Sequence, residues 1–333
     1  MAAEPAALGV LVAPYDAEPG HPGDRPIGRA ALRLEAEGCA VVFGHEARGG
    51  ALRGVRAAPE GWRPTELLPL AVAYDRFPSR SRPVAYERLV AGLQGVPLAN
   101  PPALVSLCAD KLACQQVLAA AGVEMPAVED DPARFADQLA RWGGAFLKPR
   151  YGAFGAGVRR VERPDELSPT CPGPIDGELE PALLQRAVPP PQGLAGVACR
   201  VLVQRLADGG WWAEQPVARL SRTDAVVNAA RGADVQPLQR VFPEAFEAVR
   251  QVSVAAATAL AAQPRGHWLV EVGVDVVLDG ALRPWVIEVN SRPRGRLEAL
   301  VRLDPAWTDA HVAACARPLR TLRALGSDHT DYA

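Results

Sequence analysis

A glycine-rich run follows a lysine near the middle of the chain. The segment AFLKPRYGAFGAGV places Lys148 on an apolar stretch and Gly152, Gly155 and Gly157 shortly after it. Glycine permits positive φ angles and close backbone approach, so backbone N–H groups can converge there on phosphate oxygens. A lysine just upstream could neutralise phosphate charge. Because no Gly-Lys-Ser/Thr ending of a Walker A motif follows, a phosphate-binding loop and a glycine-rich hairpin without a ligand stay open as alternatives.

Carboxylates recur at alternate positions in the later segment VEVGVDVVLDGALRPWVIEVNSRPRG. Strand alternation places Glu271, Gly273 and Asp275 on one face of a strand, and Glu288 and Asn290 on one face of the next. Two carboxylates and an amide oxygen would then meet at one point, a ligand set that suits Mg²⁺ together with substrate phosphates. The alternative is a solvated polar face of a hairpin, but the nearly continuous Val, Leu, Ile and Trp residues between these positions favour buried strands.

Buried strands and helices must position these groups. Apolar runs predict strands at 8–13, 40–43, 70–74, 146–149, 198–204, 211–220, 268–277 and 284–289, and helices at 27–37, 84–93, 106–121 and 243–262. Strands that alternate with helices predict a parallel α/β lobe over roughly the first hundred residues. Asn100–Pro102 marks the end of that lobe, Asp279–Gly280 marks a turn, and the proline-rich stretches at 164–174 and 189–191 are predicted loops.

Composition sets limits on the partners. The chain has 333 residues, 49% of them hydrophobic and 22% charged, with a formal net charge of −2. These values are typical of a soluble globular protein of two or three lobes and indicate neither a nucleic-acid nor a membrane partner. The six cysteines are scattered without a C-x-x-C pair, which predicts reduced thiols. No Lys or Arg precedes Arg25 and no apolar stretch reaches 18 residues, so we expect a cytoplasmic protein.

The order of short motifs along residues 100–295 resembles the ATP-grasp superfamily. The motifs are Asp110–Lys111, LKPRYGAFGAG, LLQRAV, CRVLV, SR…N and GVDV…IEVN. The earlier string AYDRFPSRSRPVAYERLVAGLQGVPLANP is similar to the lobe that precedes ATP-grasp in the YheC/YheD-like, spore-coat-associated branch. The resemblance implies an α/β protein (α+β in the ATP-grasp lobes) with a pre-ATP-grasp substrate lobe at 1–104, a central ATP-grasp lobe at 105–188 and a C-terminal ATP-grasp lobe at 189–333.

The resemblance also implies an ATP and Mg²⁺ site. The residues expected to contact ATP are the two lysines, the loop and the hinge, namely Lys111, Lys148, Tyr151, Gly152, Gly155, Gly157, Gln185, Arg186, Ala187 and Val188. The expected Mg²⁺ ligands are Asp275, Glu288 and Asn290. Three prolines at 189–191 replace the acidic residue that many relatives use for the ribose hydroxyls, so no ribose-binding residue is assigned.

Further residues are expected to act on the reacting groups. The resemblance places Arg200, Arg222 and Asn228 near the transferred phosphate and Arg292 near the substrate carboxylate. Arg76, Arg80 and Arg82 form a basic loop that would either bind a substrate anion or lie in solvent.

The function implied by the resemblance is ATP-dependent ligation of a carboxylate to an amine. An amide or peptide bond would form through an acyl-phosphate, with release of ADP and phosphate. The substrates would be small-molecule or peptide carboxylates and amines, and a homodimer is left open. Three alternatives on the same scaffold are a ligase that cross-links a precursor peptide, a kinase, and a non-catalytic nucleotide-binding protein of the coat type.

Overall fold

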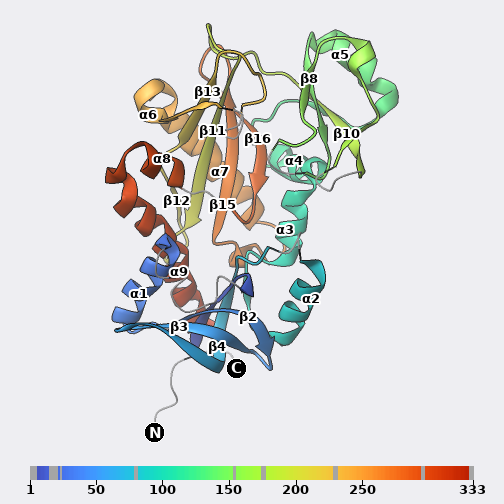
Figure 1. Ribbon diagram of the computed structural model, residues 1–333. Helices are drawn as coiled ribbons and strands as arrows, with labels where there is room; N and C mark the ends of the chain where they lie inside the picture. Colours follow the sequence, from blue (N-terminus) through green and yellow to red (C-terminus); the bar gives the residue numbers. More distant parts are fainter. Residues whose placement is uncertain are drawn as a thin grey trace.

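The computed structural model describes residues 6–14, 22, 25–78, 82–152, 155–173, 178–227, 232–293 and 297–329. Its strands form an N-terminal, a central and a C-terminal sheet. In Figure 1 the N-terminal sheet lies at the bottom, the C-terminal sheet above it, and the central sheet at the upper right. The expected mixed α/β architecture is therefore found. Among the helices in these ranges, none has the length and apolar character that a bilayer crossing requires.

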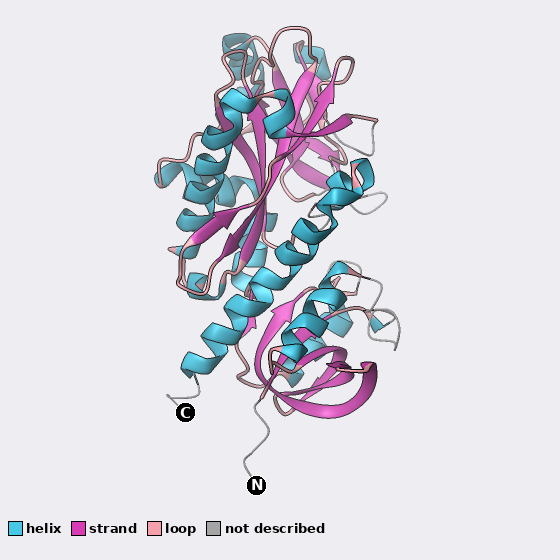
Figure 2. Ribbon diagram, turned by 90° about the vertical axis from the view of Figure 1, so that its left-hand side faces the viewer, coloured by secondary structure: helices cyan, strands magenta, loops and turns pink. Residues whose placement is uncertain are grey.

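The N-terminal sheet is mixed rather than wholly parallel. Its strands are β1 (Ala7–Leu11), β2 (Val41–Arg48), β3 (Ala51–Ala58), β4 (Gly61–Asp75) and β5 (Leu98–Ala99). The pairs β1–β2 and β1–β4 are parallel as predicted, and so is β4–β5, although β5 itself was not predicted; β3 runs antiparallel to both β2 and β4. Gly49 and Gly50, with φ of 59° and 77°, make the tight turn from β2 to β3. Because β1 pairs with both β2 and β4, the first four strands close into a ring, and Figure 2 shows their curvature.

Helices cover this sheet on two sides. They are α1 (Pro26–Ala36), α2 (Pro83–Gly92) and the C-terminal α9 (Thr308–His329). α9 was not predicted; its buried residues Val312, Cys315, Ala316 and Leu319 recur at helical spacing and share a core with the strands and α1. On the other side, Leu89 of α2 packs in a second cluster. In Figure 2, α9 is the helix that ends at the label C.

The central lobe is small. Its elements are α3 (Pro102–Ala109), α4 (Lys111–Ala120), α5 (Phe135–Trp142), β6 (Val128–Glu129), β7 (Ala145–Pro149), β8 (Arg159–Val161), β9 (Thr170–Pro172) and β10 (Leu179–Arg186). α5 and the longer strands have a core of their own, whereas the buried residues of α3 and α4 pack in the cluster of the C-terminal sheet. The helix predicted over 106–121 is in fact two helices. It breaks at Asp110, whose carboxylate accepts hydrogen bonds from the backbone N–H groups of Leu112 (3.1 Å) and Ala113 (3.2 Å). This N-cap starts α4 and sets Lys111 in its first turn.

The C-terminal sheet has the strand order β14-β13-β11-β15-β16, with β12 beside β11. The strands are β11 (Gly196–Arg205), β12 (Trp211–Ala213), β13 (Val217–Ser221), β14 (Asp234–Pro237), β15 (Glu271–Leu278) and β16 (Pro284–Asn290). The helices are α6 (Leu238–Val241), α7 (Phe246–Ala261) and α8 (Glu298–Leu303). Short 3-10 helices lie at Pro132–Arg134, Pro164–Glu166, Pro243–Ala245, Gly266–Trp268 and Pro305–Trp307. The single strand predicted over 211–220 is thus two strands, β12 and β13.

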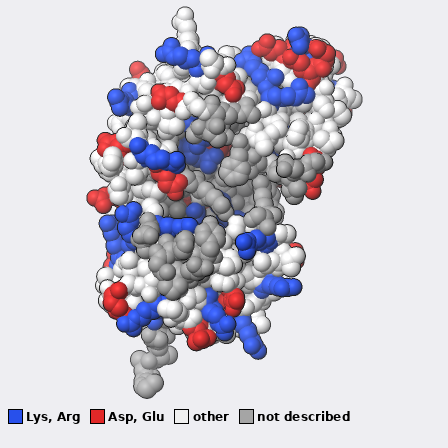
Figure 3. Space-filling model, in the orientation of Figure 1, with Lys and Arg blue, Asp and Glu red and all other residues white. Residues whose placement is uncertain are grey.

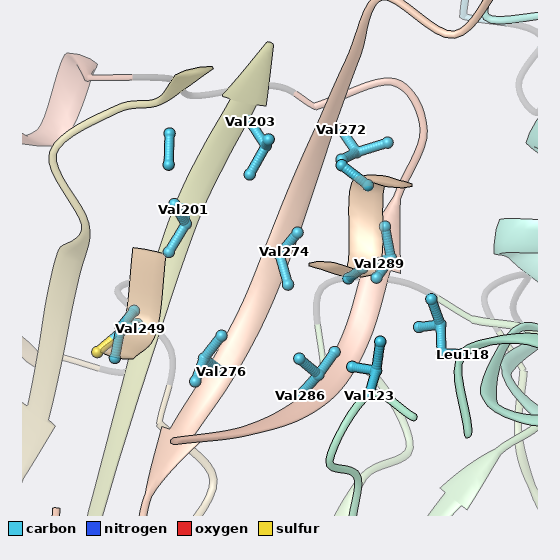
Figure 4. Close-up of a cluster of buried hydrophobic side chains, with 14 of the residues drawn as sticks. Leu118, Val123, Val201, Val203, Val249, Val272, Val274, Val276, Val286 and Val289 are labelled. Carbon is cyan, nitrogen blue, oxygen red and sulfur yellow. The ribbon is translucent and has the colours of Figure 1, made fainter. Parts of the chain in front are cut away.

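The largest apolar cluster fills one face of the C-terminal sheet. Val201, Val274 and Val286 come from three neighbouring strands and pack with Val249 of α7 (Figure 4). Since alternate residues point to opposite faces, burial of this face turns Arg200, Asp275 and their neighbours to the other side of the sheet. The opposite face carries the candidate site.

Candidate active site

A cavity of about 600 Å³ lies where the three sheets meet. Its wall includes Arg76 and Phe77 just after β4 of the N-terminal sheet, Lys148 from the central sheet, and Arg200 and Asp275 from the C-terminal sheet. Figure 3 shows Lys and Arg atoms inside the hollow on this face. A concave site with convergent polar groups at a lobe boundary is the usual form of a small-molecule site.

Two buried lysines face the cavity from the central lobe. Lys111 donates a hydrogen bond from Nζ to the carbonyl oxygen of Gly152 (3.0 Å). Lys148 donates from Nζ to Oε1 of Gln185 (3.0 Å). Burial, together with the nearby charge of Lys111, lowers the pKa of Lys148 to about 8, against the opposing effect of Glu288. The predicted pair of lysines is therefore brought together.

The glycine-rich loop joins β7 to β8 and is bonded to the first lysine. Gly155 and Gly157 have φ of 72° and 70°, the left-handed region that glycine tolerates. A Cβ on Gly157 would lie 2.4 Å from the carbonyl oxygen of Pro172, so this position also needs the absence of a side chain. Tyr151 points elsewhere: it is exposed and donates its hydroxyl to Asp110 (3.1 Å). Residues 153–154 lie outside the described ranges.

Three of the four predicted hinge residues line the cavity, and the fourth is hydrogen-bonded within the central lobe. Gln185, Arg186 and Val188 line the cavity. Ala187 does not, and its N–H donates to the carbonyl oxygen of Gly144 (3.1 Å). Gln185 is 4% exposed and its Nε2 is a buried donor without a hydrogen-bond partner among the described residues, whereas its Oε1 is held by Lys148. An orphaned buried donor in a cavity wall suits an acceptor atom of a ligand.

The predicted metal ligands meet on one face of the C-terminal sheet. The strand register sets Asp275 opposite Glu288 and Gly273 opposite Asn290. Asn290 donates from Nδ2 to Oδ2 of Asp275 at 3.4 Å. Burial, and then the charge of Asp275, raise the pKa of Glu288, while the lysines and Arg200 lower it.

This ligand set fits a magnesium ion only with help from a phosphate. Within the described ranges, no group of three or more His, Cys, Asp and Glu side chains could hold a metal by itself. Two carboxylates and an amide, with substrate phosphates, are the usual surroundings of Mg²⁺. A cation beside Asp275 and Glu288 would also relieve the like-charge repulsion that raises the pKa of Glu288. The residues present therefore fit the ion.

Two arginines share this face with the carboxylates. Arg200 lies opposite Asp275 in the register and donates to it twice, from Nε to Oδ1 and from Nη2 to Oδ2, both at 2.5 Å. Arg219 of β13 is opposite Ala198 and so points the same way as Arg200. It is half-buried in the cavity wall, and burial followed by the charge of Arg200 lowers its pKa against the effect of Asp275.

Arg219 is a site residue that the sequence analysis missed. The segment ARLSR offers both Arg219 and Arg222, and the motif resemblance pointed to Arg222. Arg222 is exposed and is not among the cavity-lining residues. If side-chain alternation is counted from the first residue of β13, Arg219 points to the cavity face. This count could not be made from the sequence, because the break between β12 and β13 was not predicted. The predicted Asn228 lies outside the described ranges.

The predicted substrate arginines are held by carboxylates across the lobe boundary. Arg76 donates from Nη1 to Oε1 of Glu271 (2.9 Å) and to the carbonyl oxygen of Pro293 (2.7 Å). Arg292 forms the reciprocal pair with Asp75 (Nη1–Oδ2 3.2 Å). Both arginines also line the cavity, whereas Arg80 lies outside the described ranges and Arg82 is exposed. Burial raises the pKa of Asp75, and Arg292 opposes this rise.

The comparisons with known proteins agree with this geometry. Residues 183–308 match the model of the YheC/D-like ATP-grasp family. The solved structure of D-cycloserine synthetase DcsG is similar with a TM-score of 0.56 and 17% identity, over 97% of this chain and 99% of that chain. D-alanyl-alanine synthetase A from Vibrio cholerae gives 0.53 and 15%, over 96% and 99%. ATP-grasp ligase PsnB, complexed with a minimal precursor, gives 0.53 and 16%, over 93% and 99%. The chain therefore has the ATP-grasp fold, with a YheC/D-like ATP-grasp segment over residues 183–308.

Proposed function

We propose that this protein is an ADP-forming, ATP-dependent ligase that joins a carboxylate to an amine. One observation carries the proposal: a sheet face bearing two arginines and two carboxylates lies across a cavity from two buried lysines and a glycine-rich loop. The similar solved structures support it, since they include synthetases and ligases, and PsnB was also solved with Mg and ADP.

Each group has a task in binding. Lys111 and Lys148 would neutralise the phosphates of ATP, and the loop at 151–157 would cover them. The free Nε2 of Gln185 and the neighbouring hinge would meet the base. Asp275, Glu288 and Asn290 would hold Mg²⁺, which when bound draws negative charge away from the phosphates.

The chemistry would proceed in two balanced steps. A substrate carboxylate oxygen bonds to the γ-phosphorus while the bond from that phosphorus to the ADP oxygen breaks, which gives an acyl-phosphate. An amine then attacks the activated carbonyl carbon, the carbon–oxygen bond to phosphate breaks, and the amine nitrogen loses a proton to the surroundings. Arg200 and Arg219 would stabilise charge on the transferred group, and closure of the loop would exclude water from the acyl-phosphate.

We propose substrates from the class of small-molecule or peptide acids and amines. D-alanyl-alanine synthetase A and the precursor-bound PsnB have equal TM-scores of 0.53 with this chain, so these two structures favour neither class over the other. Arg76 and Arg292 stay candidates for binding a substrate anion at the cavity wall. The lobe limits at residues 104 and 188, a cytoplasmic location and a homodimer stay predictions; the six free, buried cysteines fit a reducing compartment.

The decisive experiment screens pools of acids and amines for ADP release that needs both. Hydroxylamine added with ATP and the acid alone should trap an acyl hydroxamate, because it attacks the acyl-phosphate in place of the amine. Glu288→Gln should abolish both signals while the protein stays folded. An acid that supports ADP release without any hydroxamate would contradict the acyl-phosphate route and favour a kinase. Near-normal turnover of Glu288→Gln at saturating Mg²⁺ would contradict the metal assignment.

A further inference from the structure

Asn100 is a fully buried polar residue at the end of β5, where the sequence indicated only the end of a lobe. Its φ is 55°, in the left-handed region that residues other than glycine seldom adopt, although asparagine tolerates it better than most. Its backbone N–H donates to the carbonyl oxygen of Trp268 (2.9 Å). The chain is thus bent at Asn100 so that its side chain enters the C-terminal lobe.

The side-chain amide of Asn100 is saturated with hydrogen bonds to that lobe. Nδ2 donates to the carbonyl oxygens of Glu271 (3.0 Å) and Ser291. Oδ1 accepts from the N–H groups of Val270 (3.0 Å) and Glu271 (3.5 Å). These contacts use both donors and both acceptor sites of the amide.

The contacts lie directly beyond the end of a β-ladder. The pairing of β15 with β16 ends at Gly273 opposite Asn290. Past that pair, the Asn100 amide bridges Glu271 on one side and Ser291 on the other. Asn290 therefore belongs to the last ladder pair and directly precedes Ser291, one end of this bridge. The side chain of Glu271 is itself held by Tyr74, by Arg76 (2.9 Å) and by Gln204 (2.9 Å).

We infer that Asn100 is a positioning residue for the metal ligands: it fixes the separation of the two strand ends and so the place of Asn290 relative to Asp275. This inference rests on the proposed function, because it concerns the ion that Asp275, Glu288 and Asn290 would hold. Residues that orient ligands without touching the metal typically change metal affinity about 10- to 100-fold when they are replaced.

The test compares Asn100→Gly with Gln94→Gly. Glycine accepts the left-handed backbone, so Asn100→Gly removes the amide without steric strain in the backbone. Gln94 also has a positive φ (42°) but is exposed and lies away from the cavity wall, so Gln94→Gly is a matched control. The probes are Mn²⁺ in the presence of ADP, measured by electron paramagnetic resonance, and ADP without metal, measured by calorimetry.

In Asn100→Gly, we expect the affinity for Mn²⁺ in the ADP complex to fall about 10- to 100-fold, with metal-free ADP affinity changed less than about threefold. Gln94→Gly should match the wild type in both measurements. Equal losses of Mn²⁺ and metal-free ADP affinity, or Mn²⁺ binding as in the control, would overturn the inference.

If Asn100→Gly does not fold, Asn100→Asp is a second variant in which the same Mn²⁺ affinity can be measured. It keeps the acceptor for Val270 but sets an oxygen against the carbonyl oxygens of Glu271 and Ser291, so the same selective loss of Mn²⁺ is expected. A wild-type protein that binds no Mn²⁺ with ADP would overturn the proposed function itself. A wild type that binds it, with variants that bind it equally well, would overturn only the role of Asn100.

Discussion

Lys148 is buried and its pKa lies near physiological pH, so the protonation of this one residue can be followed when ATP binds. Its pKa is lowered to about 8, mainly by burial and then by Lys111. Only the charged form neutralises phosphate, and a bound polyphosphate favours that form. Above pH 8 the free protein must therefore take up a proton when it binds ATP.

We expect ATP affinity to fall as pH rises from 7 to 9, with uptake rising from near zero to about one proton per ATP. Calorimetry in buffers of different ionisation enthalpy measures this uptake. Lys148→Met should bind ATP at least about tenfold more weakly and should lose most of the pH dependence. Uptake that does not change between pH 7 and 9, or that survives in Lys148→Met, would assign the titration to another group.

The two arginines of ARLSR allow a second test at the residue scale. Arg219→Met removes a charge from the cavity wall and keeps the length of the side chain, so ADP formation should slow by about 10²- to 10³-fold. Arg222→Met alters an exposed residue and should change the rate less than twofold. Steady-state ADP release decides between them. A larger loss in Arg222→Met would restore the assignment made from the motif alone.

At the scale of one element, the glycine-rich loop contains a glycine that is constrained both by its backbone angle and by its packing. Gly157 and Gly143 share a φ of 70°, but only Gly157 lies close enough to another chain segment for a Cβ to clash. Alanine at either position is strained in the left-handed conformation, which should lower the free energy of unfolding by about 1–2 kcal/mol. Gly157→Ala should in addition push the loop away from Pro172.

We therefore expect Gly157→Ala to weaken ATP binding at least tenfold and Gly143→Ala to leave it unchanged, although both lower the free energy of unfolding. Nucleotide calorimetry and urea titration measure the two effects separately. Equal ATP affinity in the two variants would mean that the loop does not contact the nucleotide.

The elements that sequence patterns could predict are those with continuous apolar runs or clear alternation. β7, β11, β15 and β16 were found for this reason, and the Asp275–Glu288 pairing followed from alternation and one turn. β3 was missed because Arg53 and Arg56 interrupt its apolar pattern in a curled hairpin. The break at Asp110 was missed because a capping aspartate reads as one more polar position on a helix.

Contacts between lobes could not be predicted from any local pattern. Asn100, Arg76 and Arg292 obtain their partners from segments about 170 to 220 residues away in the chain. The buried face of α9 is hard to recognise in the sequence, because the helix contains Pro318 and because three arginines lie between its buried positions. The partners of such residues can be identified only from the tertiary structure.

At the scale of the whole molecule, α9 joins the first and last parts of the chain. Leu319 is fully buried in the core that α9 shares with the N-terminal sheet. Leu319→Ala should lower the free energy of unfolding by about 2–5 kcal/mol. Leu303→Ala in α8 changes a side chain that is 44% exposed and should cost much less. Urea titration followed by tryptophan fluorescence suits this test, because Trp62 and Trp268 lie in or against the same core. Equal effects of the two substitutions would mean that α9 contributes little to that core.

The packing of α9 also has a consequence for the order in which the protein can fold as it is made. The core around β1 and β2 needs Leu322, which the ribosome adds about 220 residues after β5 is complete. At roughly 5–20 residues per second, the N-terminal sheet waits about 10 to 45 seconds for its last covering helix. The core that α5 forms with the strands of the central lobe comes entirely from residues 135–184 and has no such delay. The N-terminal sheet is thus made before the central lobe but is covered after it, and a chaperone that shields exposed apolar surface would be needed longer at this sheet.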